Sequence, residues 1–407
     1  MHMKKVKLAD RAVKGKRVYY IYFHDVRFVP IHASEIIDEM QRQGHDVHVF
    51  TSIKEEAEKR KLLAQGIKLH NLPTIETRFV SEFLFMAFLF PCLFFQTLID
   101  RPDVFYSRHS ACSLIATLIA RMLKIPCLLE INDIVQDRLK FSNISILKLK
   151  WIQLYHSINY HLADLLLPVT EKISLFINHN YRINQSKVIV VTNAVNINRF
   201  SPKPCPDARK RYDIPLESNV VLSLGSLFPW AGIETLIAAA PKILERFPNT
   251  LFVVGSGEEP YVSKLKKIVY KSGLKNSFLF FGFIPWDEAS WFISAADICV
   301  SPIILKNMRT GLSSLRTFSY LACGKPVVGS NIPGLGDMLE KEGTGLSFTM
   351  GDHEALAREI ITLLDDRDRL REMGKRGRDF VIKNYSWEII VDKLEILFNG
   401  LIGTKKR

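Results

Sequence analysis

Short runs of β-branched and aromatic residues alternate with longer helical patterns along almost the whole chain. This alternation predicts βαβ units, in which crossover helices join parallel strands. In the first half we expect strands at Arg17–Phe23, Asp46–Phe50, Ile67–His70, Asp103–Tyr106, Cys127–Ile131, Leu165–Val169 and Val188–Thr192. In the second half we expect strands at Val220–Gly225, Leu251–Gly255, Phe278–Phe283, Ile298–Ser301, Pro326–Gly329 and Gly345–Phe348. The pattern indicates an α/β protein made of doubly wound parallel sheets.

One stretch near the middle of the chain interrupts the alternation. Residues 196–215 (NINRFSPKPCPDARKRYDIP) are rich in proline, charge and turn formers, which is typical of a connection between domains. A chain of 407 residues is long enough for two cores. We therefore expect a first domain over residues 1–195, a linker over 196–215 and a second domain over 216–384. Residues 385–407 should form a helix that crosses back to the first domain.

The composition is that of a folded protein with reduced thiols. The six cysteines show no CxxC spacing and most lie in apolar surroundings, and the basic N-terminus lacks the apolar run of a secretion signal. These features predict a cytoplasmic protein. The net charge of +13 falls mostly in the first 200 residues. Charge alone fits an anionic membrane surface, a nucleic acid or a phosphorylated substrate, but no nucleic-acid-binding motif accompanies it.

One segment of the first half bears on the membrane alternative. Residues 83–95 (FLFMAFLFPCLFF) are wholly apolar. A spanning helix needs roughly 20 apolar residues, so this run is too short to cross a bilayer. Two interpretations remain open: a buried helix of the first domain, or a helix that partly docks in the bilayer interface.

A loop, a helix and a strand follow one another in residues 310–330 (TGLSSLRTFSYLACGKPVVGS). Ser313 and Ser314 are candidate N-caps, and Gly324 is placed to end the helix before the next strand. The start of a helix presents N–H groups and the positive end of the helix dipole. The segment therefore predicts a site for phosphate groups.

This segment resembles the donor-binding loop and helix of family 4 glycosyltransferases of the GT-B fold. Further segments resemble the same family in the same order: residues 101–134, 163–177, 187–202, 220–241, 251–259, 278–302 and 385–387. The resemblance implies two Rossmann-like domains that face each other across a cleft, with the acceptor on the first and a nucleotide-sugar such as a UDP- or GDP-sugar on the second. It also implies a retaining transfer that needs no metal or other cofactor, in which the leaving phosphate helps to deprotonate the acceptor hydroxyl.

The resemblance also implies which residues form the site. The donor side would consist of Gly225, Ser226, Phe283, Ile284, Arg309, Gly311, Leu312, Ser313, Ser314, Arg316 and Ser319. The family usually grips the diphosphate with a basic residue and a Lys-Gly pair, where this chain has Ser226 and Ala231-Gly232. The family pattern E-x7-E is replaced by Gly311 and Ser319. Arg309 and Arg316 could compensate for the missing positive charge, or could be ordinary solvated arginines.

On the first domain, Asn132 and Asp133 stand where relatives commonly have a His-Asp pair, and they are the candidate catalytic residues. An Asx turn that caps the next helix is the structural alternative for Asp133. Asp25, Arg27, Arg108 and Glu130 are candidates for the acceptor side.

Two hypotheses follow for function. The first is a glycosyltransferase that moves a sugar to a lipid-linked or cell-surface glycan acceptor at the cytoplasmic face of a membrane, which it binds as a peripheral protein. The second is a catalytically inactive relative that acts as a binding or scaffolding partner, because Ser226, Ala231 and Ser319 replace donor-gripping residues. Neither hypothesis involves a nucleic acid, and the sequence leaves the sugar, the base, the acceptor and the oligomeric state open.

Overall fold

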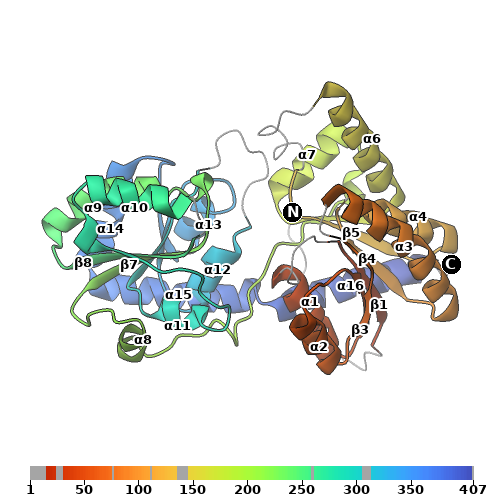
Figure 1. Cartoon of the computed structure of the whole chain (residues 1–407), viewed down its shortest axis with the longest axis horizontal. Helices are drawn as coiled ribbons and strands as arrows, with labels where there is room; N and C mark the ends of the chain where they lie inside the picture. Colours follow the sequence, from red (N-terminus) through yellow and green to blue (C-terminus); the bar gives the residue numbers. More distant parts are fainter. Residues whose placement is uncertain are drawn as a thin grey trace.

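Two α/β units follow one another along the chain (Figure 1). The computed structural model describes residues 15–23, 31–75, 78–110, 112–134, 145–257, 261–304 and 313–405. Each unit contains a six-stranded sheet in which every pair of neighbouring strands is parallel. The predicted doubly wound α/β class is therefore confirmed.

The first sheet has the strand order β3-β2-β1-β4-β5-β6. Its strands are β1 (Arg17–Ile21), β2 (Asp46–Thr51), β3 (Lys68–Asn71), β4 (Val104–Arg108), β5 (Cys127–Ile131) and β6 (Leu165–Pro168). Successive residues of β1 enter opposite cores, with Val18 and Tyr20 on one face and Tyr19 and Ile21 on the other. Both faces are buried, which explains why the central strands are apolar without alternation.

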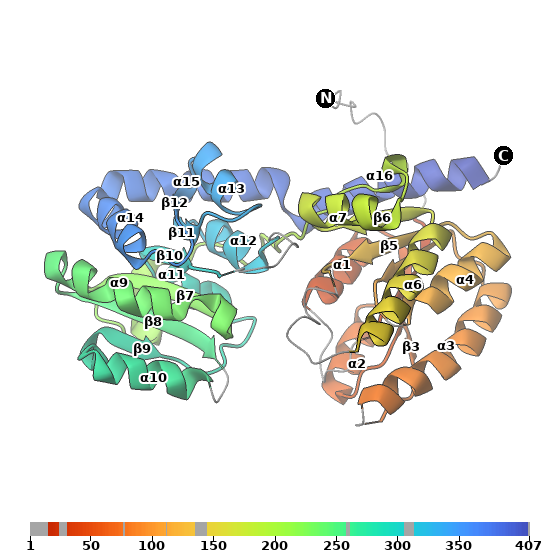
Figure 2. The same ribbon diagram turned by 90° about the horizontal axis from the view of Figure 1, so that it is seen from above.

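Helices cover both faces of this sheet: α1 (Ile31–Arg42), α2 (Glu56–Ala64), α3 (Arg78–Ile99), α4 (Ser113–Leu123), α6 (Ile146–Leu162) and α7 (Glu171–Tyr181). Buried residues of α1 and α2 share a core with Val18 and Tyr20, whereas α3 and α4 pack on the face of Tyr19. Helix α4 contacts both α3 and α6, so these three helices form one layer (Figure 2).

The expected strand at Val188–Thr192 is wrong. Among the described residues this segment makes a single bridge, between Val188 and Leu166 of β6. The amides of Ile189 and Val191 still donate to the carbonyls of Leu166 and Pro168, at 2.9 and 3.0 Å. The β-branched run therefore begins to extend the sheet edge, but the chain then leaves toward the second unit before a ladder can form.

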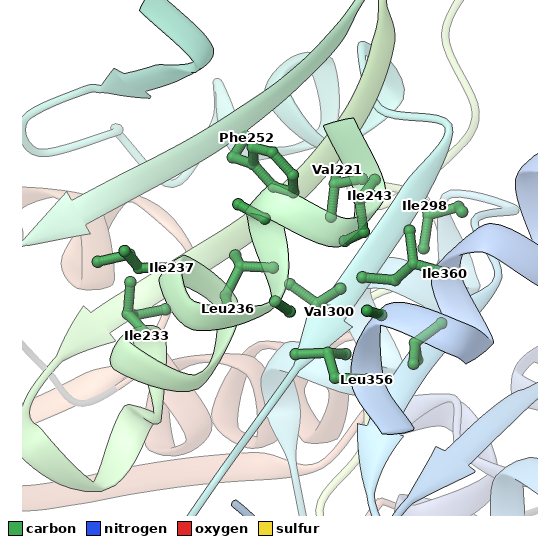
Figure 3. Packing of buried hydrophobic residues seen from close by; sticks show 14 of the residues in the cluster. Val221, Ile233, Leu236, Ile237, Ile243, Phe252, Ile298, Val300, Leu356 and Ile360 are labelled. Carbon is green, nitrogen blue, oxygen red and sulfur yellow. The ribbon is translucent and has the colours of Figure 1, made fainter. Parts of the chain in front are cut away.

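The second sheet has the strand order β12-β11-β10-β7-β8-β9. Its strands are β7 (Asn219–Leu227), β8 (Thr250–Gly257), β9 (Phe278–Phe280), β10 (Ile298–Ser301), β11 (Val327–Ser330) and β12 (Gly345–Phe348). The helices around it are α8 (Cys205–Arg211), α9 (Ile233–Arg246), α10 (Tyr261–Lys271), α11 (Ala289–Ser294), α12 (Leu315–Ala322), α13 (Gly336–Lys341), α14 (His353–Asp365) and α15 (Arg367–Asn384). In one core layer, side chains of α9 and α14 meet those of β7, β8 and β10 (Figure 3).

Residues 196–215 differ from a free linker. They contain helix α8, and Phe200, Ala208 and Ile214 are buried in the core of the second unit. Burial of three apolar side chains fixes this stretch to the second sheet.

The last helix, α16 (Trp387–Lys405), lies against the first unit (Figures 1 and 2). Trp387, Val391, Leu394 and Phe398 are buried in the core that contains α1, and α16 contacts α1 directly. The returning chain also pairs with the outgoing one, because Val195 bridges Ser386 and its amide donates to the carbonyl of Tyr385 at 2.8 Å. The chain thus passes between the two units twice, at adjacent positions.

Helix α3 is longer than the apolar run that the sequence singled out. It has 22 residues, and its part Val80–Ile99 is long and apolar enough to cross a membrane by length and composition. The expectation that this segment is too short is therefore wrong, because residues on both sides of 83–95 continue the helix.

Candidate functional site

A cavity of about 480 Å³ lies at the carboxyl ends of the second sheet's strands. Ligands of open α/β sheets bind at this edge. Seven of the eleven candidate donor residues line the cavity: Gly225, Phe283, Ile284, Ser313, Ser314, Arg316 and Ser319. The fold therefore brings together the loops after β7, β9 and β10 and the start of α12.

Several candidates lie outside the described residues. They are Asp25 and Arg27 of the first unit, Arg309, Gly311 and Leu312 of the second, and the side chain of Ser226.

The start of α12 forms one wall of the cavity. Ser314 is its N-cap, since the hydroxyl accepts a hydrogen bond from the amide of Thr317 at 3.2 Å. Ser313 is engaged differently: its hydroxyl accepts from the amide of Asn193 at 2.9 Å, and its carbonyl accepts from the Asn193 side chain at 2.8 Å. Of the two serines expected as caps, Ser314 caps the helix, and Ser313 ties it to the chain that leaves the first unit.

Arg316 brings positive charge into the cavity. A Cβ atom on Gly225 would lie 2.6 Å from the Nε and Nη2 atoms of Arg316, so the guanidinium lies directly over the backbone of β7. Gly225 has φ +133°, a conformation that side chains also disfavour. Among the described residues that line the cavity, Arg316 is the only one with a formal charge. The site is therefore suited to an anionic group.

Tyr320 fixes α12 to β7 beside Arg316. Its hydroxyl donates to the carbonyl of Leu224 at 2.8 Å and accepts from the amide of the same residue at 2.7 Å. Burial raises the pKa of Tyr320, and the charge of Arg316 opposes that rise. The tyrosine is therefore a neutral anchor that holds α12 against the end of β7, one turn after Arg316.

Ser319 lines the cavity but has little to offer a ligand. It is 5 % exposed, and its hydroxyl donates to the carbonyl of Leu315, one turn earlier, at 2.9 Å. Only its acceptor capacity remains for a ligand. Ser319 can therefore accept a hydrogen bond from a ligand but has no hydroxyl proton free to donate.

Two tryptophans that the sequence did not single out join the candidate Phe283 in an aromatic wall of the cavity. Trp230 and Trp286 line the cavity, and Phe228 stacks on Trp230 with the ring centroids 5.8 Å apart. Phe283 is 80 % exposed at the rim. The signal for Trp230 was its place next to Ala231-Gly232, in the loop that follows β7.

Gly232 holds that loop in place. It has φ +72°, and a Cβ there would lie 1.7 Å from the carbonyl oxygen of Pro302. Gly273, with φ +71° and open space around it, is a matched control. Left-handed backbone costs both alanine variants about 1–2 kcal/mol, and only Gly232→Ala must also shift the backbone. We expect urea unfolding to show Gly232→Ala as less stable than Gly273→Ala by about 1–3 kcal/mol. Equal losses would contradict the close contact.

On the first unit, Glu130 is the centre of a buried polar cluster. It is 2 % exposed, accepts from the hydroxyl of Tyr106 at 2.7 Å, and pairs with His32 at 2.9 Å and with Arg108 at 3.7 Å. Asn132 also donates to it. Burial alone would raise the pKa of Glu130, but His32, Arg108 and Asn132 outweigh burial and lower it to about 2. Glu130 is therefore held as a buried carboxylate that fixes Asn132 and Arg108 in place, and its expected acceptor-side role stays a prediction.

The candidate residues of the two units do not share the cavity. Arg108, Glu130, Asn132 and Asp133 are absent from its described lining, to which only Asn193 and residues beyond it contribute. The structure thus holds a cavity at the strand ends of the second unit and a buried polar cluster at the strand ends of the first.

Comparison with known proteins agrees with this architecture. The family model of glycosyl transferases group 1 matches residues 206–380, and that of glycosyltransferase family 4 matches residues 29–199. The chain is 30% identical over 211 residues, 51% of its length, to a GDP-mannose-dependent alpha-(1-6)-phosphatidylinositol monomannoside mannosyltransferase of Mycobacterium tuberculosis. This match spans about half, 54%, of that relative.

Two longer matches cover nearly the whole chain. An uncharacterized glycosyltransferase of Methanocaldococcus jannaschii is 23% identical over 88% of this chain and 91% of its own. A solved glycosyltransferase of Rickettsia africae has a TM-score of 0.77 at 17% identity and covers 96% of this chain and 99% of its own. The fold is that of the GT-B glycosyltransferases, and the chain belongs to glycosyltransferase family 4.

Proposed function

We propose that this protein is a retaining, metal-independent glycosyltransferase. It would transfer a sugar from a nucleotide-sugar, such as a UDP- or GDP-sugar, to a lipid-linked or cell-surface glycan acceptor. The reaction would take place at the cytoplasmic face of a membrane, to which the protein binds peripherally. The observation that carries the proposal is the guanidinium of Arg316 over Gly225, beside the capped start of α12.

The cavity supports departure of a nucleoside diphosphate. Cleavage of the bond between the sugar and the diphosphate leaves negative charge on the phosphate oxygens. A fixed guanidinium and the N-terminal end of a helix stabilise charge that develops at such a position. Arg316 would thereby replace the missing basic residue and Lys-Gly pair. The acceptor hydroxyl would attack the sugar carbon and lose its proton to the leaving phosphate, so that no further cofactor takes part.

The aromatic wall supports the binding of the rest of the donor. Trp230, Trp286 and Phe283 present apolar faces to the cavity, whose lining is mainly apolar. Such faces suit a base or the apolar side of a sugar ring, and they exclude water from the reacting centre.

The polar cluster on the first unit would serve the acceptor. Closure of the two units would bring Asn132 and Asp133 toward the transferred sugar, with Glu130 fixing Asn132 through their hydrogen bond. Arg108, paired with the same carboxylate, would lie on the acceptor side.

Titration of the purified protein with UDP and GDP tests the proposal. We expect at least one nucleotide to bind below millimolar concentration and to quench tryptophan fluorescence, because Trp230 and Trp286 line the cavity. Hydrolysis and transfer assays over a panel of nucleotide-sugars would follow. Absence of binding at millimolar concentration would contradict the proposal, and binding without turnover of any donor would favour the inactive, scaffolding alternative.

A further inference from the structure

The exposed apolar side chains of this protein are concentrated on one layer of helices. More than half of the large hydrophobic side chains that are exposed, among the described residues, belong to α3, α4 and α6. The most exposed are Phe83 (70 %), Phe95 (60 %) and Ile99 (81 %) of α3, Met122 (61 %) of α4, and Leu147 (67 %) and Trp151 (64 %) of α6. Because α4 contacts both of the other helices, the three helices form one layer (Figure 2), and the exposed apolar side chains of this layer are here called the α3–α4–α6 face. A surface of this kind marks an interaction site.

Helix α3 cannot act as an isolated spanning helix. Phe85, Leu89 and Leu93 recur every fourth residue and are fully buried in the domain core. The hydroxyl of Tyr19, on the central strand β1, also donates to the carbonyl of Asp100 at 2.6 Å. Yet only 22% of the most apolar window of α3 is buried, so it is not a core helix either. One side of α3 is therefore packed against the domain core along its length. Most of its other apolar side chains are not buried by protein.

The charges around this surface complete the pattern. No charged residue lies between Glu82 and Asp100 in the sequence. Arg101, Arg121 and Lys124 are exposed where α3 and α4 end. The Arg101 guanidinium donates to the carbonyl of Leu123 at 2.9 Å, which brings the two helix ends together. An apolar surface with cations at its border matches the acyl and headgroup layers of an anionic leaflet.

We infer that the α3–α4–α6 face inserts into one leaflet of a lipid bilayer, parallel to its plane, and is held mainly by apolar burial and secondarily by anionic headgroups. The inference deepens the proposed function, in which a lipid-linked acceptor would be met at that surface. A second copy of this chain is a less favourable partner for the face. A self-complementary interface would bring the basic borders of the two copies close together, and their charges would repel.

Flotation of the full-length protein with two kinds of vesicle tests this inference. One kind contains phosphatidylcholine alone and the other contains phosphatidylcholine mixed with phosphatidylglycerol. We expect binding to both, tighter to the anionic vesicles, with high salt removing the difference but not the binding. Trp151 fluorescence should shift to shorter wavelength as vesicles are added.

A double variant, Phe83→Ser with Phe95→Ser, tests which surface binds. Both side chains are exposed, so the fold should tolerate the change, and vesicle partitioning should fall about a hundredfold, roughly tenfold for each lost side chain. The matched control is Leu216→Ser, which removes an exposed side chain of the second unit (57 %) and should leave partitioning unchanged.

Three results would overturn the inference. They are absence of binding to either vesicle, binding that high salt abolishes, and binding that the double variant leaves unaltered. Light scattering that shows a dimer dissociated by the double variant, together with absent vesicle binding, would assign the face to self-association instead. Nucleotide titration of the same double variant should match the unmodified protein, so failure of the proposed function would appear there and not in the vesicle assay.

Discussion

Replacing Arg316 with alanine should lower kcat by about a hundredfold to a thousandfold and weaken UDP or GDP binding at least tenfold. The guanidinium is the only formal charge among the described residues of the cavity lining, and loss of one fixed donor to developing negative charge typically has this effect on kcat. Steady-state kinetics with the active donor, together with nucleotide titration, would measure both quantities.

Three further variants sharpen this prediction. Arg316→Lys keeps the charge without the planar fork, so it should lie between the alanine variant and the unmodified protein. Gly225→Ala should resemble Arg316→Ala, because its new Cβ would occupy space 2.6 Å from the guanidinium. Lys271→Ala removes an exposed positive charge of α10 and should change neither quantity. Nucleotide affinity that is unaltered in Arg316→Ala would remove Arg316 from the donor site.

Replacing Glu130 with leucine should destabilise the protein by about 3–5 kcal/mol. Glu130 is buried, and its removal leaves Arg108 and Asn132 without the carboxylate that they share. Urea unfolding at neutral pH would measure the loss. Glu217→Gln changes an exposed glutamate and should stay within the error of the measurement.

The lowered pKa of Glu130 predicts that the stability of the protein depends on pH. The pKa of this carboxylate is depressed in the folded protein, from 4.5 to about 2, so its contribution is fully present above pH 4.5 and is lost as the pH falls toward 2. Unfolding free energies measured across this range should therefore fall more steeply for the unmodified protein than for Glu130→Gln. Parallel curves would show that Glu130 is not the responsible group.

Much of the fold could be predicted because periodicity is a local property. Buried parallel strands are short apolar runs, and the runs at Cys127–Ile131, Ile298–Ser301 and Gly345–Phe348 became strands with those bounds. The run at Val188–Thr192 is also mainly apolar, but it forms a single bridge because the chain then leaves toward the second unit. The apolar run 83–95 underestimates the length of α3 for a related reason. Polar residues near its ends do not stop the helix, because one side of it is packed against the domain core.

The sequence could predict those parts of the candidate site that are formed by strand-end loops and by the start of a helix. The loops after β7 and β9 and the segment beginning at Ser313 do converge on one cavity. The sequence could not show that Ser319 points its hydroxyl back into its own helix, or that Glu130 is buried behind Asn132. Such facts depend on which side of an element faces the core, and that is settled by packing between segments far apart in sequence.

The paired crossings at Val195 and Ser386 limit how this protein can be recombined. Because Trp387 and Phe398 complete the core around α1, the first unit consists of two separate pieces of chain. A fragment that ends at residue 195 would leave those apolar positions open to water. Exchange of the second unit between relatives therefore needs two junctions, one near Val195 and one near Ser386. A chimera with a single junction would pair the first unit of one relative with the α16 of another.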